Sequence, residues 1–148
     1  MGIHKRRDTN KWQAYYRDPS GRQRSKDFAL KRDAVRWEAS KRRDIDRGEW
    51  IDPEQARTTV GAIWLKFIQT RSVKASTLAS YEEVWRNLIA PRWSDVHLNR
   101  VLSSEVLEWV ATMEGPRGPV SGARARKALT VLRMVLDHAV LDRRLASN

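Results

Sequence analysis

The chain has 148 residues and no cysteine, so disulfides and thiolate metal sites are excluded. It carries 29 Lys and Arg against 18 Asp and Glu, which gives a formal net charge of +11. An excess of this size indicates a polyanionic partner, because each cation that neutralises a phosphate releases counterions. Nucleic acid is the partner we expect. A basic membrane-surface helix is disfavoured, since no window separates an apolar face from a basic one.

The histidines and the apolar runs exclude further classes. His4, His97 and His138 lie far apart in sequence, and no two of them share a helical turn, so we expect no metal site and no cofactor. No apolar run is long enough to span a membrane, and no apolar segment follows the basic N-terminus. The expected protein is soluble and cytoplasmic.

Positive charge is concentrated at the start of the chain. The first 32 residues hold ten Lys or Arg and only three Asp. The hydrophobic pattern also changes along the chain, from alternation to helical spacing. We therefore expect two domains, at residues 1–57 and 58–148.

An antiparallel sheet is predicted near the N-terminus. Two runs, residues 12–17 and 22–28, flank a turn in which Pro19 presets φ and Gly21 accepts a positive φ. With residues 3–7 as a first short strand, the simplest arrangement is a three-stranded antiparallel sheet. Together with the helix that follows, it would form an α+β domain.

Side-chain alternation assigns the two faces of this sheet. A helix expected from Lys31 to about Gly48 would cover the face that carries Trp12, Ala14 and Tyr16. The other face would stay bare. We assign to it a polar and basic set of side chains: Gln13, Tyr15, Arg17, Arg22, Arg24 and Lys26.

The bare face has two interpretations. A small sheet fits the major groove of B-DNA, where Arg, Gln and Lys pair with the edges of guanine and adenine. A half-buried antiparallel sheet also always has one polar face, which can serve solubility alone. The pattern by itself does not decide between them.

Residues 58–148 are predicted to be all-α, with four helices that close one small core. Asp52-Pro53 indicates a linker before them, and Thr59 is a suitable N-cap for the first helix. Pro91 is expected to close the second helix. The apolar stripes at helical spacing are Val60, Ile63, Trp64, Phe67 and Ile68; Leu78, Tyr81, Val84, Trp85, Leu88 and Ile89; Val106, Leu107, Val110 and Met113; and Ala125, Ala128, Leu129, Leu132, Val135, Leu136, Ala139 and Val140.

Three stretches carry a family resemblance. They comprise Lys11-Trp12-Gln-Ala-Tyr-Tyr-Arg-Asp-Pro-Ser-Gly21 with Lys26-Asp-Phe28 and Ala34-Val-Arg-Trp37; Val60-Gly-Ala-Ile-Trp64 with Val73-Lys-Ala-Ser-Thr77, Tyr81 and Ile89-Ala-Pro91; and Leu129 to Ala139 with Arg144-Leu-Ala-Ser-Asn148. In this order they resemble the N-terminal half of phage integrases of the tyrosine recombinase family. The first looks like the arm-type DNA-binding domain, the second like the opening of the helical, SAM-like core-binding domain, and the third like the approach to the catalytic domain. The family usually has a proline in the cap before Thr77, which this chain lacks.

The resemblance implies a division of labour on DNA. The arm-type sheet enters the major groove of accessory sites, so the bare face should contact base edges, while Lys5 and Arg7 reach phosphates. The core-binding domain clamps the core site, and helix N-termini favour phosphate there. The implied core-type residues are Lys74, Ser76, Thr77, Tyr81, Arg124, Arg126 and Lys127. Simple N-capping is an alternative role for Thr77 and Ser121.

The resemblance also implies what this stretch lacks. The family attacks DNA with a tyrosine assisted by arginines, a lysine and a histidine of a C-terminal domain. Tyr15, Tyr16 and Tyr81 lie in segments expected to form the sheet and the bundle, and not in a catalytic domain of that kind. We expect no catalytic residue here, and a chain that binds DNA for phage integration or excision without cutting it. Its implied partner is double-stranded DNA of phage and host attachment sites, bound by a tetramer of the full-length protein in the bacterial nucleoid.

Two other classes stay open. A stand-alone DNA-binding regulator, excisionase-like or a transcription factor, could also use a basic sheet, although it would end in a polar tail instead of directly after an apolar helix. A purely structural helical interaction domain is the third class. The concentration of charge at the N-terminus argues against it.

Overall fold

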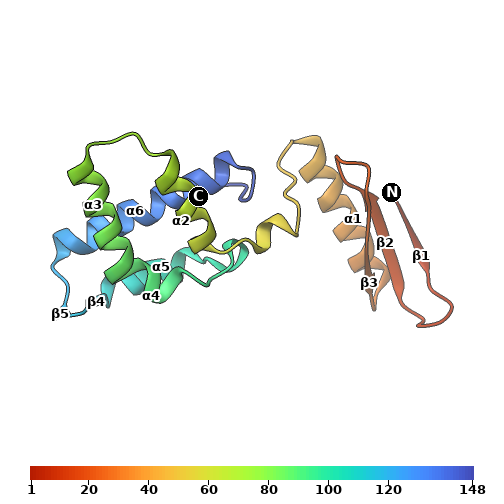
Figure 1. The fold of residues 1–148 in the computed structure, drawn as a ribbon. Coiled ribbons are helices and arrows are strands. Elements are labelled where there is room, and N and C mark those ends of the chain that lie inside the picture. The colour runs from red at the N-terminus through yellow and green to blue at the C-terminus, as the bar shows by residue number, and fades with distance from the viewer. The chain divides into compact units, whose positions relative to one another are not determined.

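The computed structural model describes residues 1–148 and divides them into two compact units, Met1–Trp50 and Ile51–Asn148. We call them the sheet unit and the helical unit (Figure 1). Trp50 belongs to the sheet unit, where its Nε1 donates a hydrogen bond of 3.1 Å to the Tyr16 hydroxyl. None of the helices is both long enough and apolar enough to cross a lipid bilayer.

The sheet unit confirms the predicted three-stranded antiparallel sheet packed on one helix. Its elements are β1 (Gly2–Lys5), β2 (Trp12–Arg17), β3 (Gln23–Phe28) and α1 (Lys31–Asp46), and β2 is the central strand. The first strand ends at Lys5 and not at Arg7, because the chain already turns at residues 7–9 and Asn10 adopts a φ of 54°. Gly48, with a φ of 68°, follows the end of α1 as predicted.

Helix α1 covers one face of the sheet, as Figure 1 shows. Ala14 and Tyr16 of β2 and Ala34 of α1 are fully buried between the two layers. The Trp37 ring of α1 packs against Tyr16 with 5.4 Å between ring centroids, and against Phe28 with 5.7 Å. The predicted buried side of β2 is therefore confirmed.

The register between β2 and β3 overturns part of the predicted face assignment. Arg17 pairs with Gln23, Tyr16 with Arg24 and Ala14 with Lys26, so Arg24 and Lys26 share the helix-covered face. The turn predicted at residues 18–21 would have paired Arg17 with residue 22. A shift of one residue moves every side chain of a strand to the opposite face. Placing Arg24 and Lys26 beside Gln13, Tyr15 and Arg17 was wrong for this reason.

The buried carboxylate of Asp18 fixes this turn. Its Oδ1 accepts hydrogen bonds from the Ser20 hydroxyl at 2.6 Å and from the backbone N–H groups of Ser20 and Arg22, each at 3.0 Å. Its Oδ2 pairs with Arg24 Nε at 3.1 Å, and the Asp18 side chain is completely shielded from solvent. The Ser20 hydrogen bond, followed by the Arg24 and backbone donors, lowers the pKa of Asp18 from 3.8 to about 2. Arg22, predicted on the bare face, is held at the turn by its backbone N–H.

The helical unit contains α2 (Val60–Thr70), α3 (Ala75–Val84), the π-helix η2 (Trp85–Ile89), α4 (Ala90–Trp93), α5 (Ser103–Ala111) and α6 (Gly122–Leu141). Short 3-10 turns lie at η1 (Gln55–Arg57) and η3 (Leu98–Arg100), and β4 (Glu114–Gly115) pairs with β5 (Gly118–Pro119). Helix α6 contacts α2, α3 and α5 and runs through the middle of the unit in Figure 1. The predicted mainly helical region of about four helices is confirmed.

Pro91 does not close the second helix, as the sequence had suggested. The helical path runs on from α3 through η2 into α4, where Pro91 stands in the first turn and needs no N–H partner. The extension brings Trp93 into the core, where it is fully buried. Trp64 of α2 and Trp85 of η2 stack with ring centroids 4.6 Å apart.

Three finer expectations about the helices have mixed outcomes. Thr59 caps α2 by accepting a hydrogen bond from the Ala62 N–H at 3.2 Å, as predicted. Lys74 occupies the N-cap position of α3, so Thr77 lies inside the first turn and is not the cap. Leu107, assigned to an apolar stripe, is 66% exposed because α5 buries only its other side, at Val106 and Val110.

Acid should destabilise the sheet unit through Asp18. The folded-state pKa of this carboxyl lies below the ordinary value, so its stabilising contribution is complete above pH ~4 and is lost as the pH falls toward 2. The amide NMR signals of Ser20 and Arg22, which donate to the carboxylate, should titrate with a midpoint near 2. Asp18→Asn should abolish this titration. A midpoint near 4 would contradict the network.

Removing part of one core side chain should destabilise the helical unit. Ile63 is fully buried, so Ile63→Ala should lower the free energy of unfolding by ~2–5 kcal/mol. Leu65 of the same helix is 59% exposed, and Leu65→Ala is the matched control with little expected loss. Urea unfolding followed by tryptophan fluorescence measures both variants. Equal losses would show that α2 is oriented differently.

Candidate nucleic-acid interface

The face of the sheet opposite α1 is covered by no other element of the sheet unit, and we call it the open face. Strand register and alternation place on it a mostly neutral polar set: Gly2, His4, Gln13, Tyr15, Arg17, Gln23, Ser25 and Asp27. The predicted residues Gln13, Tyr15 and Arg17 are therefore brought together. The pattern missed His4, Gln23 and Ser25, which the alternation would have revealed only with the correct register.

The Tyr15 side chain lies over Gly2 of the first strand on the open face. A Cβ on Gly2 would come within 2.6 Å of the Tyr15 hydroxyl and 2.8 Å of its ring, so a larger residue there would displace the ring. The ring also tilts against His4, with 6.1 Å between centroids. The hydroxyl of Tyr15 therefore lies over Gly2 of the edge strand β1.

Positive charge lies at the two ends of the open face. Arg17 is exposed at one end. At the other end, Arg6 and Lys11 pair through a backbone hydrogen bond of 2.8 Å, and alternation continues the open face to both. Between these ends, Asp27 is the single acidic residue that the strands place on this face.

Arg6 is tied down by two carboxylates. Asp8 binds it in a bidentate manner, with Nε–Oδ1 at 3.1 Å and Nη2–Oδ2 at 2.6 Å, and Asp27 accepts from its Nη1 at 3.2 Å. The hydrogen bond and charge of Asp8 raise the pKa of Arg6, and the same hydrogen bond lowers the pKa of Asp8. The guanidinium is thus held in one orientation at the end of the sheet.

The remaining predicted residues of the sheet unit lie outside the open face. Arg24 is only 18% exposed and pairs with Asp18. Lys26 is exposed with its Nζ 5.5 Å from the Phe28 ring centroid. Lys5, opposite Trp12, and Arg7, in the turn, are also exposed. Lys5, Arg7 and Lys26 are therefore exposed outside the open face and are not part of its polar set.

In the helical unit, the predicted residues fall on the boundary between α3 and α6 and on its flanks. Lys127 of α6 donates to the Ser80 hydroxyl of α3, and Arg124 pairs with Glu83. Sequence reasoning missed Ser80 and Glu83. The sequence could have indicated them by their spacing from Ser76, because residues at i, i+4 and i+7 lie on the same side of a helix.

The predicted core-type set does not form one continuous surface. Lys74 and Ser76 are exposed at the start of α3, whereas Thr77 is half-buried and Tyr81 packs against the core. Arg126 is exposed on α6 but lies roughly 200° around the helix axis from Arg124. The structure therefore groups Arg124 and Lys127 with α3 and separates Arg126 from them.

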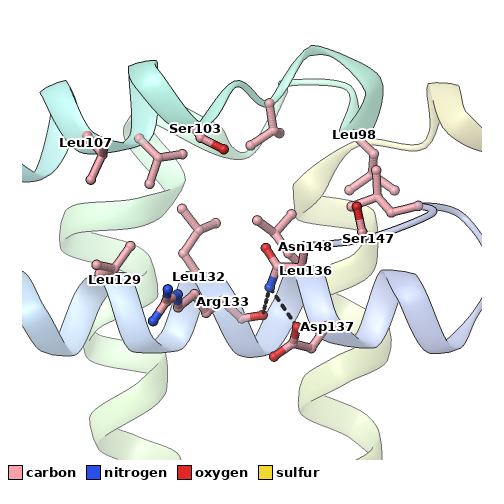
Figure 2. A pocket seen from close by; sticks show the side chains of 13 residues that line it. Leu98, Ser103, Leu107, Leu129, Leu132, Arg133, Leu136, Asp137, Ser147 and Asn148 are labelled. Carbon is pink, nitrogen blue, oxygen red and sulfur yellow. Dashed lines mark hydrogen bonds between the residues drawn. The ribbon is translucent and has the colours of Figure 1, made fainter.

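A groove of about 670 Å³, lined by both apolar and polar side chains, lies between α5 and α6 (Figure 2). Leucine side chains from both helices point into it, and Asn148 closes one side by donating to the Arg133 carbonyl at 3.1 Å and to Asp137 Oδ1 at 2.7 Å. No group of three or more His, Cys, Asp or Glu is arranged to hold a metal ion. Polar and basic side chains gather at the open face and at the α3–α6 boundary, which are therefore the candidate surfaces for nucleic acid.

Comparison with known proteins gives a consistent family of relatives. The chain is 29% identical over 147 residues to the prophage phiRv2 integrases of two Mycobacterium tuberculosis strains, across 95% of this chain and 38% of each relative. It is 30% identical over 146 residues to an integrase of Mycobacterium phage D29, across 92% of this chain and 38% of the relative. No family model and no solved structure matches. The chain thus spans well under half the length of these relatives, and it is homologous to part of the integrases of mycobacterial phages and prophages.

Proposed function

We propose that the chain binds double-stranded DNA of phage and host attachment sites as the non-catalytic N-terminal portion of a tyrosine-type phage integrase. The open face of the sheet is the observation that carries this proposal. It is a bare polar surface on a sheet whose other face is buried against α1. The integrase names of the three relatives support the link to recombination.

The size of the sheet suits the major groove. Three strands spaced ~4.8 Å apart make a ribbon about 10 Å wide between the outer strand axes. The major groove of B-DNA is ~12 Å wide. Gln13, Gln23 and Arg17 carry the donors and acceptors that pair with adenine and guanine edges there. Solubility alone does not require amides and a hydroxyl in place of charges on this face.

The charge distribution suits the same geometry. Apart from the Asp27 carboxylate, neutral hydrogen-bonding groups occupy the middle of the open face. Arg17 is exposed at one end, and Lys11 lies beside the ion-paired Arg6 at the other, with Lys5 and Arg7 next to the face. In a groove, the middle of an inserted sheet meets the bases while its ends approach the phosphates. Arg17 lies opposite Gln23, and we assign its long side chain to a base edge next to that glutamine. The arm-type role that we propose for the sheet unit therefore depends on the residues of the open face and not on the set predicted from the sequence. In this proposal Arg24 supports the turn and does not contact bases.

The helical unit is proposed to bind core-type DNA through the α3–α6 boundary. Lys74, Arg124 and Lys127 supply the charge, and Ser76 and Ser80 supply hydroxyl donors between them. Phosphate contacts from such a surface would position the chain without selecting a sequence. Arg126, on another side of α6, would contribute only to long-range attraction.

The other parts of this proposal concern the whole recombinase. In that protein, a tyrosine of a catalytic domain would cleave DNA, and four copies would assemble on the DNA. These steps would take place in the bacterial cytoplasm, at the nucleoid. The stand-alone regulator is the competing function, and integrase relatives give it no support. Addition of this chain to DNA should give shifted complexes without strand breaks.

Arg17→Ala tests the open face. The wild-type chain is first used to select a preferred duplex from a random-sequence library. The binding free energy of the Arg17→Ala variant for this duplex should be weaker by ~1–3 kcal/mol, as expected for a lost base contact. Arg36 is exposed on α1, on the other side of the sheet unit, and Arg36→Ala changes the net charge equally. Fluorescence anisotropy titrations compare the two. Equal weakening by both variants would exclude the open face, and failure to enrich any sequence would contradict the arm-type role.

Lys127→Ala tests the α3–α6 boundary. Loss of one phosphate contact should weaken binding on every duplex and lower the slope of log K against log salt by about 1. Lys66 of α2 is ion-paired with Asp142 at the far end of α6, about 22 Å along the helix from residue 127. Lys66→Ala is therefore a control for lost charge. An equal change of slope in both variants would argue against a defined contact at Lys127.

A further inference from the structure

Asp27 stands where a surface built for DNA should not carry a negative charge. Its register places it opposite Gln13, which in turn faces His4, so the three side chains form one row across the open face. The side chain is 31% exposed. Every other side chain that the strands place on this face is neutral or basic. A carboxylate in this row approaches the bases and repels the phosphates around it.

The known contacts of Asp27 do not account for its position. Arg6 is the one partner of its carboxylate, through Oδ2, while Oδ1 accepts no hydrogen bond from the protein. Arg6 is already held by the bidentate pair with Asp8. An exposed ion pair of this kind adds little stability. One carboxylate oxygen therefore stays available on the surface that faces the groove.

Base chemistry gives this oxygen a partner. In the major groove, a carboxylate can accept a hydrogen bond from the N4 amino group of cytosine, which presents no acceptor there. The guanine and thymine edges present acceptors that repel a carboxylate, and adenine places its N7 acceptor next to its N6 amino group. Binding is then favoured at one base pair and penalised elsewhere. The repulsion between a carboxylate and base acceptors lowers the affinity for sequences without this cytosine more than the affinity for the sequence that has it.

We propose that Asp27 is a specificity-determining residue of the open face, which accepts a hydrogen bond from a cytosine amino group and weakens binding to all other sequences. This inference rests on the proposed DNA-binding function of the sheet. Arg6 has a positioning role beside it, because the guanidinium fixes Oδ2 and leaves Oδ1 directed away from the pair. The partner is one C·G base pair within the arm-type site.

The test uses the whole chain, the duplex that the wild type selects from a random-sequence library, and a pool of unselected duplexes. Asp27→Asn should bind the unselected pool more tightly, and the ratio of selected to unselected affinity should fall by about tenfold, the value for one lost base contact. A repeated selection with this variant should lose its cytosine preference at one position and gain adenine, because Asn pairs with the adenine edge.

Two controls separate the possible causes. Asp33 lies in the first turn of α1, on the other side of the sheet, so Asp33→Asn makes the same charge change away from the open face. Asp8→Asn releases Arg6 from its bidentate partner without altering the row of Asp27. Asp33→Asn should leave the affinity ratio unchanged, and Asp8→Asn should leave the base preference unchanged.

The outcomes distinguish this inference from the function beneath it. If the wild-type chain enriches no sequence, the DNA-binding proposal itself fails. If it does, but Asp27→Asn behaves as Asp33→Asn does, then only general charge matters and the role of Asp27 is overturned. If Asp8→Asn loses the same base preference, Asp27 acts only by anchoring Arg6. The Ser20 and Arg22 amide signals, which report on the turn, verify that each variant keeps the sheet folded.

Discussion

The pairing register of β2 and β3 is the constraint on which the character of the sheet unit depends. Arg17 lies opposite Gln23, and this one pairing decides which half of the β3 side chains meets α1 and which half faces outward. Asp18 holds the register from within the turn, since its carboxylate gathers donors from Ser20, Arg22 and Arg24. A buried acid thus determines the composition of a surface on the opposite side of the sheet.

This constraint changes how the basic residues of the N-terminal segment should be understood. Their number suggests a surface covered with cations, but the register directs Arg24 and Lys26 away from the open face, and Asp8 and Asp27 hold Arg6. The open face that results is mostly neutral and polar, with Arg17 exposed at one end and with Arg6 ion-paired beside Lys11 at the other. Such a surface suits selection among sequences better than uniform attraction to phosphate, since charge alone carries no sequence information.

The helical unit depends on a different interaction, the packing of aromatic side chains around α6. The stacked pair of Trp64 and Trp85 joins α2 to the second helical segment, and Trp93 extends that segment into the core. Trp93 lies in this core because the helical path continues from η2 into α4, which contains Pro91 in its first turn. The α3–α6 boundary, where Lys127 meets Ser80, is held in place by this core.

The sequence by itself determined the classes of structure in this protein. Turn residues, alternation and helical spacing are local signals, and they gave the sheet, α1, the helices and the buried side of β2. They also carried the resemblance to phage integrases that the relatives confirm. These conclusions needed no knowledge of which residues lie opposite one another.

Only the tertiary structure decided which side chains form the candidate surfaces. Register is a relation between two strands, and the turn residues 18–22 allow two pairings that differ by one residue and exchange the faces of β3. The buried network of Asp18 selects between them, and nothing in the local pattern marks this acid as buried. Likewise, the meeting of α3 with α6 depends on how the helices pack, because helical periodicity fixes the sides of each helix but not its neighbours.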